Sequence, residues 1–246
     1  MFWKHRNRIV FFHIPKCAGT SVYRSLAHTL SDRTPLDKLL YRHRLTIIHD
    51  DWHKKRRTQK LRRARRSRFV TGHFEWSTYK EINPQPDDFL FTFLRNPKDR
   101  LLSLFRYLSD PQGSKWLEKR GVSSTNIIDF FETGHPHINW QIDNVMVRTF
   151  AGKYAEPLNT SAEWNEALQI AKRNLSKLDF IGNNVSFDKD LSFLSHRLEL
   201  PLNKDTTQEN KSTISRDNFL VTQELEEILS PRHRYDDLLY DYALKI

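Results

Sequence analysis

The sequence is poor in cysteine and glycine and has no long apolar run. Its one cysteine, Cys17, cannot form an internal disulfide or supply the ligands of a Cys₄ or Cys₂His₂ zinc site. No window approaches the ~18 apolar residues that span a bilayer, and no signal-peptide pattern precedes the first apolar segment. We therefore expect a cytoplasmic chain without a structural metal. Because only seven residues are glycine, each is a candidate for a positive φ or for close approach of a ligand.

Positive charge is what the sequence has in excess, with a formal net charge of +10 at pH 7. Ten Lys or Arg and no acid lie between Lys54 and Arg68, and without them the chain is nearly neutral. Three interpretations stay open for this run. It is a helix or a flexible insertion in solvent around residues 53–67, a docking surface for an acidic glycan, or a nucleic-acid patch. Docking of a polyanion would weaken with salt.

The 246 residues, 38% of them hydrophobic, are enough for one large domain, which we expect to span residues 1–246. Short apolar runs predict strands at 8–14, 68–74, 88–94 and 178–184. Helical patterns start at Ser21 and Pro97 and cover residues near 123–132, 140–150, 161–177, 187–198, 217–229 and 231–243. This alternation predicts an α/β fold with a mainly parallel β-sheet flanked by helices.

The loop after the first strand has the composition of an anion site. The segment HIPKCAGTS, residues 13–21, combines Lys16, Gly19 and two hydroxyls, and a helix follows it directly. Backbone N–H groups, a helix N-terminus and a cation together hold phosphate well. The segment is not a Walker A loop, because Lys16 precedes its only glycine, and no Walker-B-like acid follows a strand. A magnesium-dependent NTPase or a nucleotide kinase with a degenerate loop is therefore disfavoured.

A second anion-binding pair follows the third predicted strand. Arg95 ends that strand, and Ser103 lies eight residues further on, two turns into the next helix. Both side chains could reach one phosphate at the carboxyl edge of the sheet.

These two segments resemble PAPS-dependent sulfotransferases of the heparan sulfate 2-O type and their bacterial relatives, where PAPS is 3′-phosphoadenosine-5′-phosphosulfate. HIPKCAGTS resembles their 5′-phosphosulfate-binding loop, and FLRNPKDRLLSLFRY at 93–107 their 3′-phosphate-binding segment. A weaker resemblance extends through 143–152, 179–194 and the terminal LLYDYA. It implies a P-loop-like single domain and transfer of a sulfuryl group from PAPS to an acceptor hydroxyl, expected to be on a carbohydrate. The product nucleotide would be adenosine 3′,5′-bisphosphate.

The resemblance also implies residue roles. Lys16 would bond the bridging oxygen and sulfate of PAPS. Arg95 and Ser103 would hold the 3′-phosphate, and Lys211 and Ser212 could close over the nucleotide, although a solvated loop fits them equally well. The residues implied to hold the 5′-phosphate are Cys17, Ala18, Gly19, Thr20 and Ser21. Cys17 and Ala18 depart from the Thr-Gly or Thr-Ala of many relatives, but both are small.

A base must remove the proton of the attacking hydroxyl. His73, in TGHFEW, follows the second predicted strand, and a neutral imidazole suits that task near pH 7. A histidine in a similar Gly-His context acts as the base in the 2-O relatives, so the resemblance points to His73. Glu75 is the rival, since other sulfotransferase branches use a carboxylate.

Weaker candidates lie around these segments. Trp76 could stack on a sugar, while His13 is expected to be structural. Candidates for the acceptor side are His135, His137, Asn144 and Arg148, the last two with a helix-surface role as the default.

The sequence therefore predicts an in-line sulfuryl transfer that needs no metal. The alternative is a nucleic-acid- or polyanion-binding α/β protein, which would need only the basic run. The acceptor and the oligomeric state stay open.

Overall fold

The computed structural model describes residues 8–30, 43–49, 54–118, 127–132, 134, 136–202 and 222–246. In this part of the chain, the strands are β1 (Ile9–Phe12), β2 (His43–His49), β3 (Ser67–His73), β4 (Phe89–Leu94) and β5 (Phe180–Asn183). The helices are α1 (Gly19–Thr29), α3 (Lys54–Ala64), α4 (Trp76–Glu81), α5 (Pro97–Ser109), α6 (Pro111–Glu118), α7 (Ile127–Glu132), α8 (Pro136–Ile142), α9 (Val145–Ala151), α10 (Ser161–Leu175), α11 (Phe187–Leu198) and α12 (Gln223–Ala243).

The strands form one parallel sheet in the order β2-β3-β1-β4-β5. From β1 the chain runs outward to β2, returns through β3, and then crosses β1 to reach β4 and β5. The strand order therefore reverses beside β1, and ligands of such sheets bind outside the carboxyl ends of the strands at this point. The predicted α/β fold with a parallel sheet flanked by helices is confirmed.

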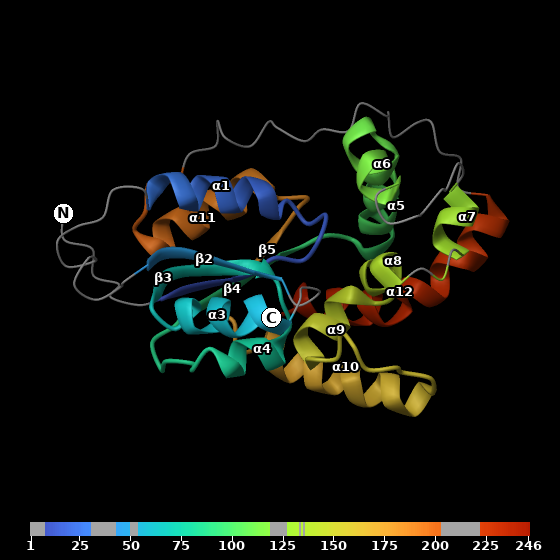
Figure 1. Cartoon of the computed structure of the whole chain (residues 1–246). Coiled ribbons are helices and arrows are strands. Elements are labelled where there is room, and N and C mark those ends of the chain that lie inside the picture. Colours follow the sequence, from blue (N-terminus) through green and yellow to red (C-terminus); the bar gives the residue numbers. More distant parts are fainter. Residues whose placement is uncertain are drawn as a thin grey trace.

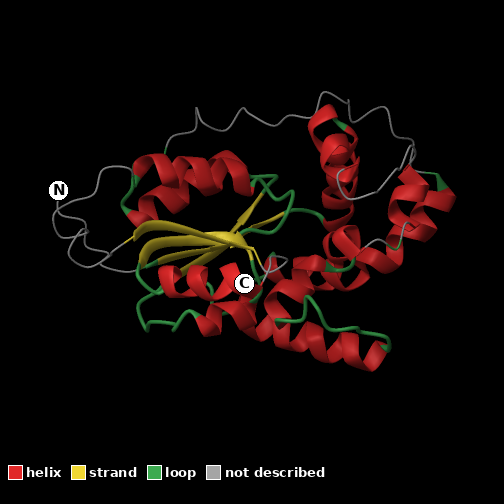
Figure 2. Cartoon of the chain, in the orientation of Figure 1, coloured by secondary structure: helices red, strands yellow, loops and turns green. Residues whose placement is uncertain are grey.

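Helices cover both faces of the sheet because alternate residues of a strand point to opposite sides. Ile9 and Phe11 of β1 share a buried cluster with residues of α1 and α11. Val10 and Phe12 belong to a second cluster, to which α3, α4, α9, α10 and α12 contribute. Figures 1 and 2 show the resulting layers, with α1 and α11 above the sheet and α3 and α4 below it.

A third buried cluster joins α5, α6, α7, α8 and the first half of α12. These helices lie at the right of Figure 1, beside the carboxyl edge of the sheet. Within the described residues, no helix combines the length and the apolar character that crossing a bilayer requires.

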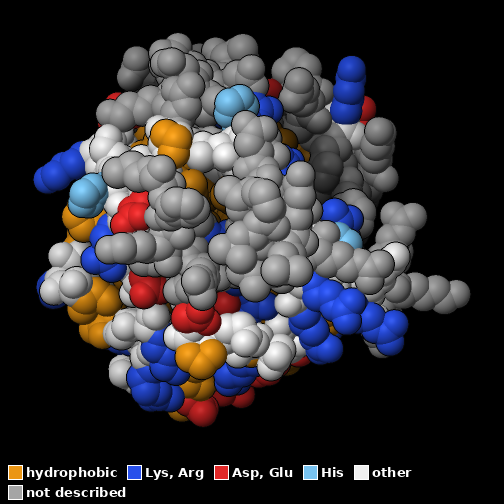
Figure 3. Space-filling model, turned by 90° about the vertical axis from the view of Figure 1, so that its left-hand side faces the viewer, with side chains coloured by type: hydrophobic (Ala, Val, Ile, Leu, Met, Phe, Trp, Pro, Cys, Tyr) orange, Lys and Arg blue, Asp and Glu red, His pale blue; other side chains and the backbone are white. Residues whose placement is uncertain are grey.

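The basic run forms regular structure. Residues 54–64 are α3, the crossover helix between β2 and β3, and Leu61 and Ala64 of α3 are buried against the sheet. Arg57 forms a two-pronged ion pair with Glu81 of α4, with N–O distances of 2.6 and 2.7 Å. A groove of about 570 Å³ lies near the end of α3. The residues that line it are His43, Gln59, Arg62, Arg63, Arg65 and Arg66. The groove lies at the amino ends of β2 and β3, and Figure 3 shows Lys and Arg side chains gathered on this face.

The four predicted strands are confirmed within a residue or two, but β2 was not predicted. It is an edge strand whose sequence, HRLTIIH, mixes polar and apolar residues, and most of its side chains are only half-buried. An edge strand of this kind lacks the continuous apolar run of a central parallel strand. The sequence also predicts no helix between the one that starts at Pro97 and the one near 123–132, whereas α6 begins at Pro111.

Two helix predictions, one near Asn144 and one near Pro231, are wrong, and Asn144 is involved in both. The pattern at 140–150 is split between α8 and α9, and Asn144 between them has a left-handed φ of 45°. The predicted pair of helices at 217–229 and 231–243 is, in the described residues, the single helix α12, which continues through Pro231.

Asn144 inserts into the hydrogen-bond ladder of α12 directly after Pro231. Its Nδ2 donates to the carbonyl of Pro231 at 3.1 Å, and its backbone N–H donates to the carbonyl of Arg232 at 2.7 Å. Its Oδ1 accepts from the backbone N–H groups of Tyr235 and Asp236. The inserted residue satisfies carbonyl and N–H groups of the turn that follows the proline, which supports the continuation of the helix there.

Candidate functional site

The loop after β1 carries two residues in a conformation that side chains rarely adopt. It joins Phe12 to α1, and Lys16 and Ala18 have φ values of 67° and 59°. A left-handed backbone costs a residue with a Cβ about 1–2 kcal/mol, and such strain is frequent at ligand sites. A loop of this kind that leads into a helix N-terminus is suited to hold an anion.

Gly19 is needed for space rather than for its φ. A Cβ at position 19 would lie only 1.9 Å from Cδ2 of His13, whereas Gly19 is absent from the residues with positive φ in the described chain. The group that approaches this glycine is therefore a side chain of the protein itself.

A cavity of about 550 Å³ opens at the carboxyl ends of β1, β3 and β4. Three segments that are distant in the sequence converge on it: the loop after β1, the end of β3 and the start of α5. The predicted site residues that line it are Lys16, Ala18, Gly19, Thr20, Ser21, His73, Arg95 and Ser103. The parallel sheet thus brings the two anion-binding segments and the proposed base to one place.

Not every predicted cofactor residue faces this cavity. Cys17 is buried behind the loop, where the backbone N–H of Arg95 hydrogen-bonds to its sulfur. Burial raises the pKa of Cys17 to about 12, so its thiol is neutral. Lys211 and Ser212 lie outside the described residues, as do His135 and the side chain of His137.

The lining of the cavity carries positive charge from Lys16, Arg24 and Arg95. Burial, reinforced by the charge of Arg95, lowers the pKa of Lys16 to about 8. The Nζ atom of Lys16 lies 4.0 Å from the ring centroid of Tyr107, a cation–π contact. An anionic ligand would offset the repulsion between these cations, so the lining favours phosphate or sulfate.

His73, the last residue of β3, presents a free acceptor nitrogen. Its Nδ1 lies 2.7 Å from the backbone oxygen of His13. A carbonyl oxygen only accepts, so Nδ1 carries the proton and Nε2 keeps its lone pair. Burial lowers the pKa of His73 despite this hydrogen bond, and the ring is therefore neutral near pH 7.

His73 belongs to a cluster of three histidines. Its ring centroid lies 4.5 Å from that of His13 and 5.1 Å from that of His49. The backbone N–H of His73 donates to Nδ1 of His49, its register partner on β2. Burial lowers the pKa of His13 and lowers that of His49 to about 4, so the cluster is uncharged. Among the described residues, no group of three or more His, Cys, Asp or Glu is arranged to hold a metal ion.

Glu75 and Trp76 have other tasks. The Glu75 carboxylate accepts hydrogen bonds from the backbone N–H of Tyr154 at 2.6 Å and from the hydroxyl of Ser77 at 2.5 Å. It ties α4 to the loop after α9 and does not line the cavity. Trp76 is 4% exposed and stacks on Phe12, so the expectation that it meets a sugar is wrong.

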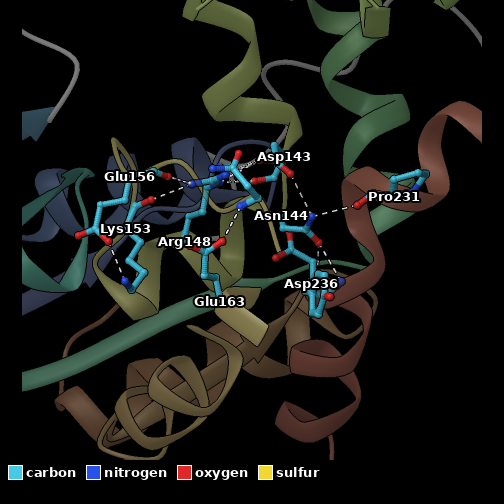
Figure 4. A network of polar contacts seen from close by, with 10 residues as sticks. Asp143, Asn144, Arg148, Lys153, Glu156, Glu163, Pro231 and Asp236 are labelled. Carbon is cyan, nitrogen blue, oxygen red and sulfur yellow. Dashed lines mark hydrogen bonds and ion pairs between the residues drawn. The ribbon is translucent and has the colours of Figure 1, made fainter. Parts of the chain in front are cut away.

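Asn144 and Arg148 belong to an internal network, which Figure 4 shows. The Arg148 guanidinium is paired with the Asp143 carboxylate at 2.5 Å and donates to the carbonyls of Lys153 and Glu156. Both Asn144 and Arg148 are buried and neither lines the cavity. The helix-surface role and the acceptor role expected for them are both wrong.

Several cavity residues were missed by the sequence analysis. Arg24 follows Ser21 by three residues and Tyr107 follows Ser103 by four, so helical spacing could have placed both on the faces that carry the predicted residues. Gln141, Asn184 and Phe187 also line the cavity, but no sequence signal connects them with the two motifs.

The chain is similar to known sulfotransferases. A family model described as the sulfotransferase family matches residues 1–243. Among solved structures, the chain is similar to the mouse sulfotransferase SULT7A1 complexed with PAP, with 13% sequence identity and a TM-score of 0.37. The similarity covers 98% of this chain and 89% of that chain. No curated protein matches the sequence significantly.

Proposed function

This chain belongs to the sulfotransferase family, and we propose that it transfers a sulfuryl group from PAPS to a hydroxyl of a carbohydrate. The observation that carries the proposal is the convergence of Lys16, Arg95 and His73 on one cavity at the carboxyl edge of the sheet. Two anion sites and a base are what the transfer needs.

The donor fits a cavity whose walls hold positive charge at both predicted phosphate positions. Lys16 and the backbone and hydroxyl groups of Gly19, Thr20 and Ser21 would bind the 5′-phosphosulfate. Arg95 and Ser103 would bind the 3′-phosphate. The lowered pKa of Lys16 supports this fit, because an anion beside it would stabilise its charged form. PAPS supplies the activated sulfuryl group.

Transfer requires that one bond to sulfur form while another breaks. The acceptor oxygen attacks sulfur, the sulfur–oxygen bond to the 5′-phosphate breaks, and the acceptor proton passes to Nε2 of His73. Lys16 stabilises the charge that grows on the leaving phosphate, and adenosine 3′,5′-bisphosphate is released. The hydrogen bond from His73 Nδ1 to His13 holds the ring in the tautomer that can accept this proton.

The groove at the amino ends of β2 and β3 favours an acidic carbohydrate as the acceptor. Among the described residues, its border includes Arg62, Arg63, Arg65 and Arg66 and no acidic side chain. It lies at the opposite end of β3 from His73, so a polymer bound there would have to be long enough to reach the cavity. The same charges would suit a nucleic acid. Competition between an acidic polysaccharide and a DNA duplex for binding, at several salt concentrations, would distinguish the two.

Calorimetric titration with adenosine 3′,5′-bisphosphate, adenosine 5′-monophosphate and ATP tests the donor site. We expect the bisphosphate to bind most tightly, and Lys16→Ala and Arg95→Ala each to weaken its binding about 10–100-fold, the value of a charged hydrogen bond. Arg173→Ala, on the exposed surface of α10, is the matched control and should have no effect. Equal affinity for the bisphosphate and the monophosphate would refute the proposal.

Turnover with radiolabelled PAPS and a panel of glycans tests the base. His73→Asn keeps a donor for the carbonyl of His13 but has no basic nitrogen. We expect it to lower turnover about 10²–10⁴-fold while bisphosphate affinity stays within about twofold. Glu75→Gln should retain most of the activity. A larger loss in Glu75→Gln than in His73→Asn would assign the base to Glu75.

A further inference from the structure

Arg100 of α5 is a fully buried cation without a hydrogen-bond partner. Its side chain is 0% exposed, and it is the largest of the fully buried side chains in the described residues. None of its three guanidinium nitrogens has a partner in that part of the chain. A buried charge without partners is costly, because burial removes its hydration and nothing replaces it. Such an arrangement needs a reason.

Two other buried arginines, Arg148 and Arg8, have partners at all three guanidinium nitrogens. Arg148 has the carboxylate of Asp143 and three backbone carbonyls as partners. Arg8 is bound by Asp88 and two backbone carbonyls. The fold therefore satisfies these two buried guanidinium groups, whereas Arg100 is the arginine for which all three nitrogens lack a hydrogen-bond partner in the described residues.

Arg100 lies directly behind the wall of the candidate active site. It precedes Ser103, a cavity residue, by three positions on α5, and it is electrostatically coupled to Cys17 in the phosphate loop. Cys17 itself lies between Lys16 and Ala18, which line the cavity. Arg100 itself does not line the cavity, so an effect of its charge on a bound anion would act through the loop.

Asp236 of α12 is the nearest acidic influence on Arg100 but does not pair with it. Its two carboxylate oxygens accept hydrogen bonds from the backbone N–H groups of Met146 and Val147, at 3.1 and 2.8 Å. These bonds cap the first turn of α9. Burial raises the pKa of Asp236 to about 6 even with Arg100 nearby, so this carboxylate is still mostly ionised at pH 7 and offsets part of the charge of Arg100. Two cations, Arg100 and Arg95, and the one carboxylate of Asp236 act on Cys17, so positive charge exceeds negative charge around the loop.

We propose that Arg100 is a positioning residue for the nucleotide, whose unpaired charge attracts the phosphates from behind the loop and lowers the stability of the empty protein. The proposal rests on the proposed function and adds to it a residue that no motif of the sequence assigned. The proposal predicts opposite effects of removing the charge on two quantities. The empty protein should not become less stable, whereas its affinity for the bisphosphate should fall. A purely structural arginine would lower both stability and affinity when replaced.

The test compares Arg100→Met, which keeps the length and removes the charge, with Arg100→Lys, which keeps the charge. Calorimetric titration with adenosine 3′,5′-bisphosphate should show about tenfold weaker binding for Arg100→Met and a change within about threefold for Arg100→Lys. Thermal unfolding of the empty Arg100→Met protein should occur at a temperature equal to or above that of the wild type, since a well-packed apolar residue often replaces a buried charge without loss. Arg148→Met is the matched control and should lower the unfolding temperature while leaving the affinity unchanged.

Unchanged bisphosphate affinity in Arg100→Met would overturn the inference, and so would a lower unfolding temperature of the empty protein. If Arg100→Met fails to fold, Arg100→Gln replaces it with the same expected loss of affinity. The proposed function fails separately, when the wild-type protein itself shows no preference for the 3′-phosphate. If the wild-type protein prefers the 3′-phosphate and Arg100→Met binds the bisphosphate equally tightly, the role of Arg100 is refuted and the proposed function is not.

Discussion

The two ends of the parallel sheet hold buried positive charge in different ways. At the amino end, Arg8 precedes β1 and Asp88 precedes β4, and the two side chains form an ion pair in which they are 4% and 1% exposed. At the carboxyl end, Lys16 lies in the loop after β1 and Arg100 lies near it, and neither forms an ion pair within the described residues. At the amino ends of β1 and β4, a cation and an anion are thus paired, whereas positive charge is in excess at their carboxyl ends.

The pair at the amino end is complete on both sides. Arg8 also donates to the carbonyls of Ile82 and Asn83, while Asp88 accepts from the hydroxyl of Tyr79 and the backbone N–H of Gln85. Charge that is satisfied within the chain serves the fold and has no need of a ligand. Lys16 and Arg100 at the carboxyl end form no such ion pair within the described residues. We interpret the excess of cations there as suited to bind an anionic substrate.

Breaking the closed pair should have the largest effect. Asp88→Asn leaves the Arg8 charge buried without its counter-charge, and we expect it to lower the free energy of unfolding by about 3–5 kcal/mol. Urea denaturation measures this loss. Because the pair is remote from the cavity, the folded variant should bind adenosine 3′,5′-bisphosphate like the wild type. A loss of affinity without a loss of stability would reverse the roles that we give to the two ends.

The cations of the carboxyl end should instead respond to pH. With a pKa of about 8 in the empty protein, Lys16 is about 90% charged at pH 7 and about 10% charged at pH 9. Bisphosphate affinity should therefore fall about tenfold between these pH values, since only the charged form binds well. His13 and Cys17 do not change charge in this range, because their pKa values lie well below 6.5 and at about 12.

The same shift acts on stability with the opposite sign. The pKa of Lys16 is lowered from 10.5, so the unfolded chain holds this proton more tightly than the folded chain does. The unfavourable contribution of Lys16 to folding is fully present below about pH 8 and disappears as the pH rises toward 10.5. Calorimetry at pH 7, 8 and 9 measures the affinity, and Lys16→Arg, which stays charged, should remove its pH dependence. An affinity that is constant with pH in the wild type would mean that Lys16 does not contact the phosphates.

Much of this contrast could be predicted from the sequence, because it lies in short segments at strand ends. The apolar runs around Val10, Val70 and Phe91 predicted three central strands, and parallel pairing then placed Lys16, His73 and Arg95 at one edge. Their roles in binding and catalysis stay predictions until the variants are measured.

What could not be predicted depends on contacts between distant segments. Arg100 precedes the apolar stripe of its helix, and its buried surroundings include Cys17, Tyr154 and Asp236, which are distant from it in the sequence. The path of α12 through Pro231 likewise depends on Asn144, which no local pattern connects with it. The inward or outward direction of Cys17 is set by the left-handed residues on both sides of it, and composition does not reveal them.

The smallest expected effect concerns the cation–π contact of Lys16 with Tyr107 in the empty protein. Tyr107 places a neutral ring, 40% exposed, under the Lys16 ammonium at 4.0 Å, where the amino end of the sheet uses a carboxylate. An exposed cation–π contact is worth about 0.5–1 kcal/mol, so Tyr107→Leu should lower the pKa of Lys16 by about 0.4–0.7 units. The midpoint of the pH dependence of bisphosphate affinity should move to lower pH by that amount. Tyr107→Phe keeps the ring and should leave the midpoint in place, whereas an equal shift in both variants would assign the effect to the phenol hydroxyl.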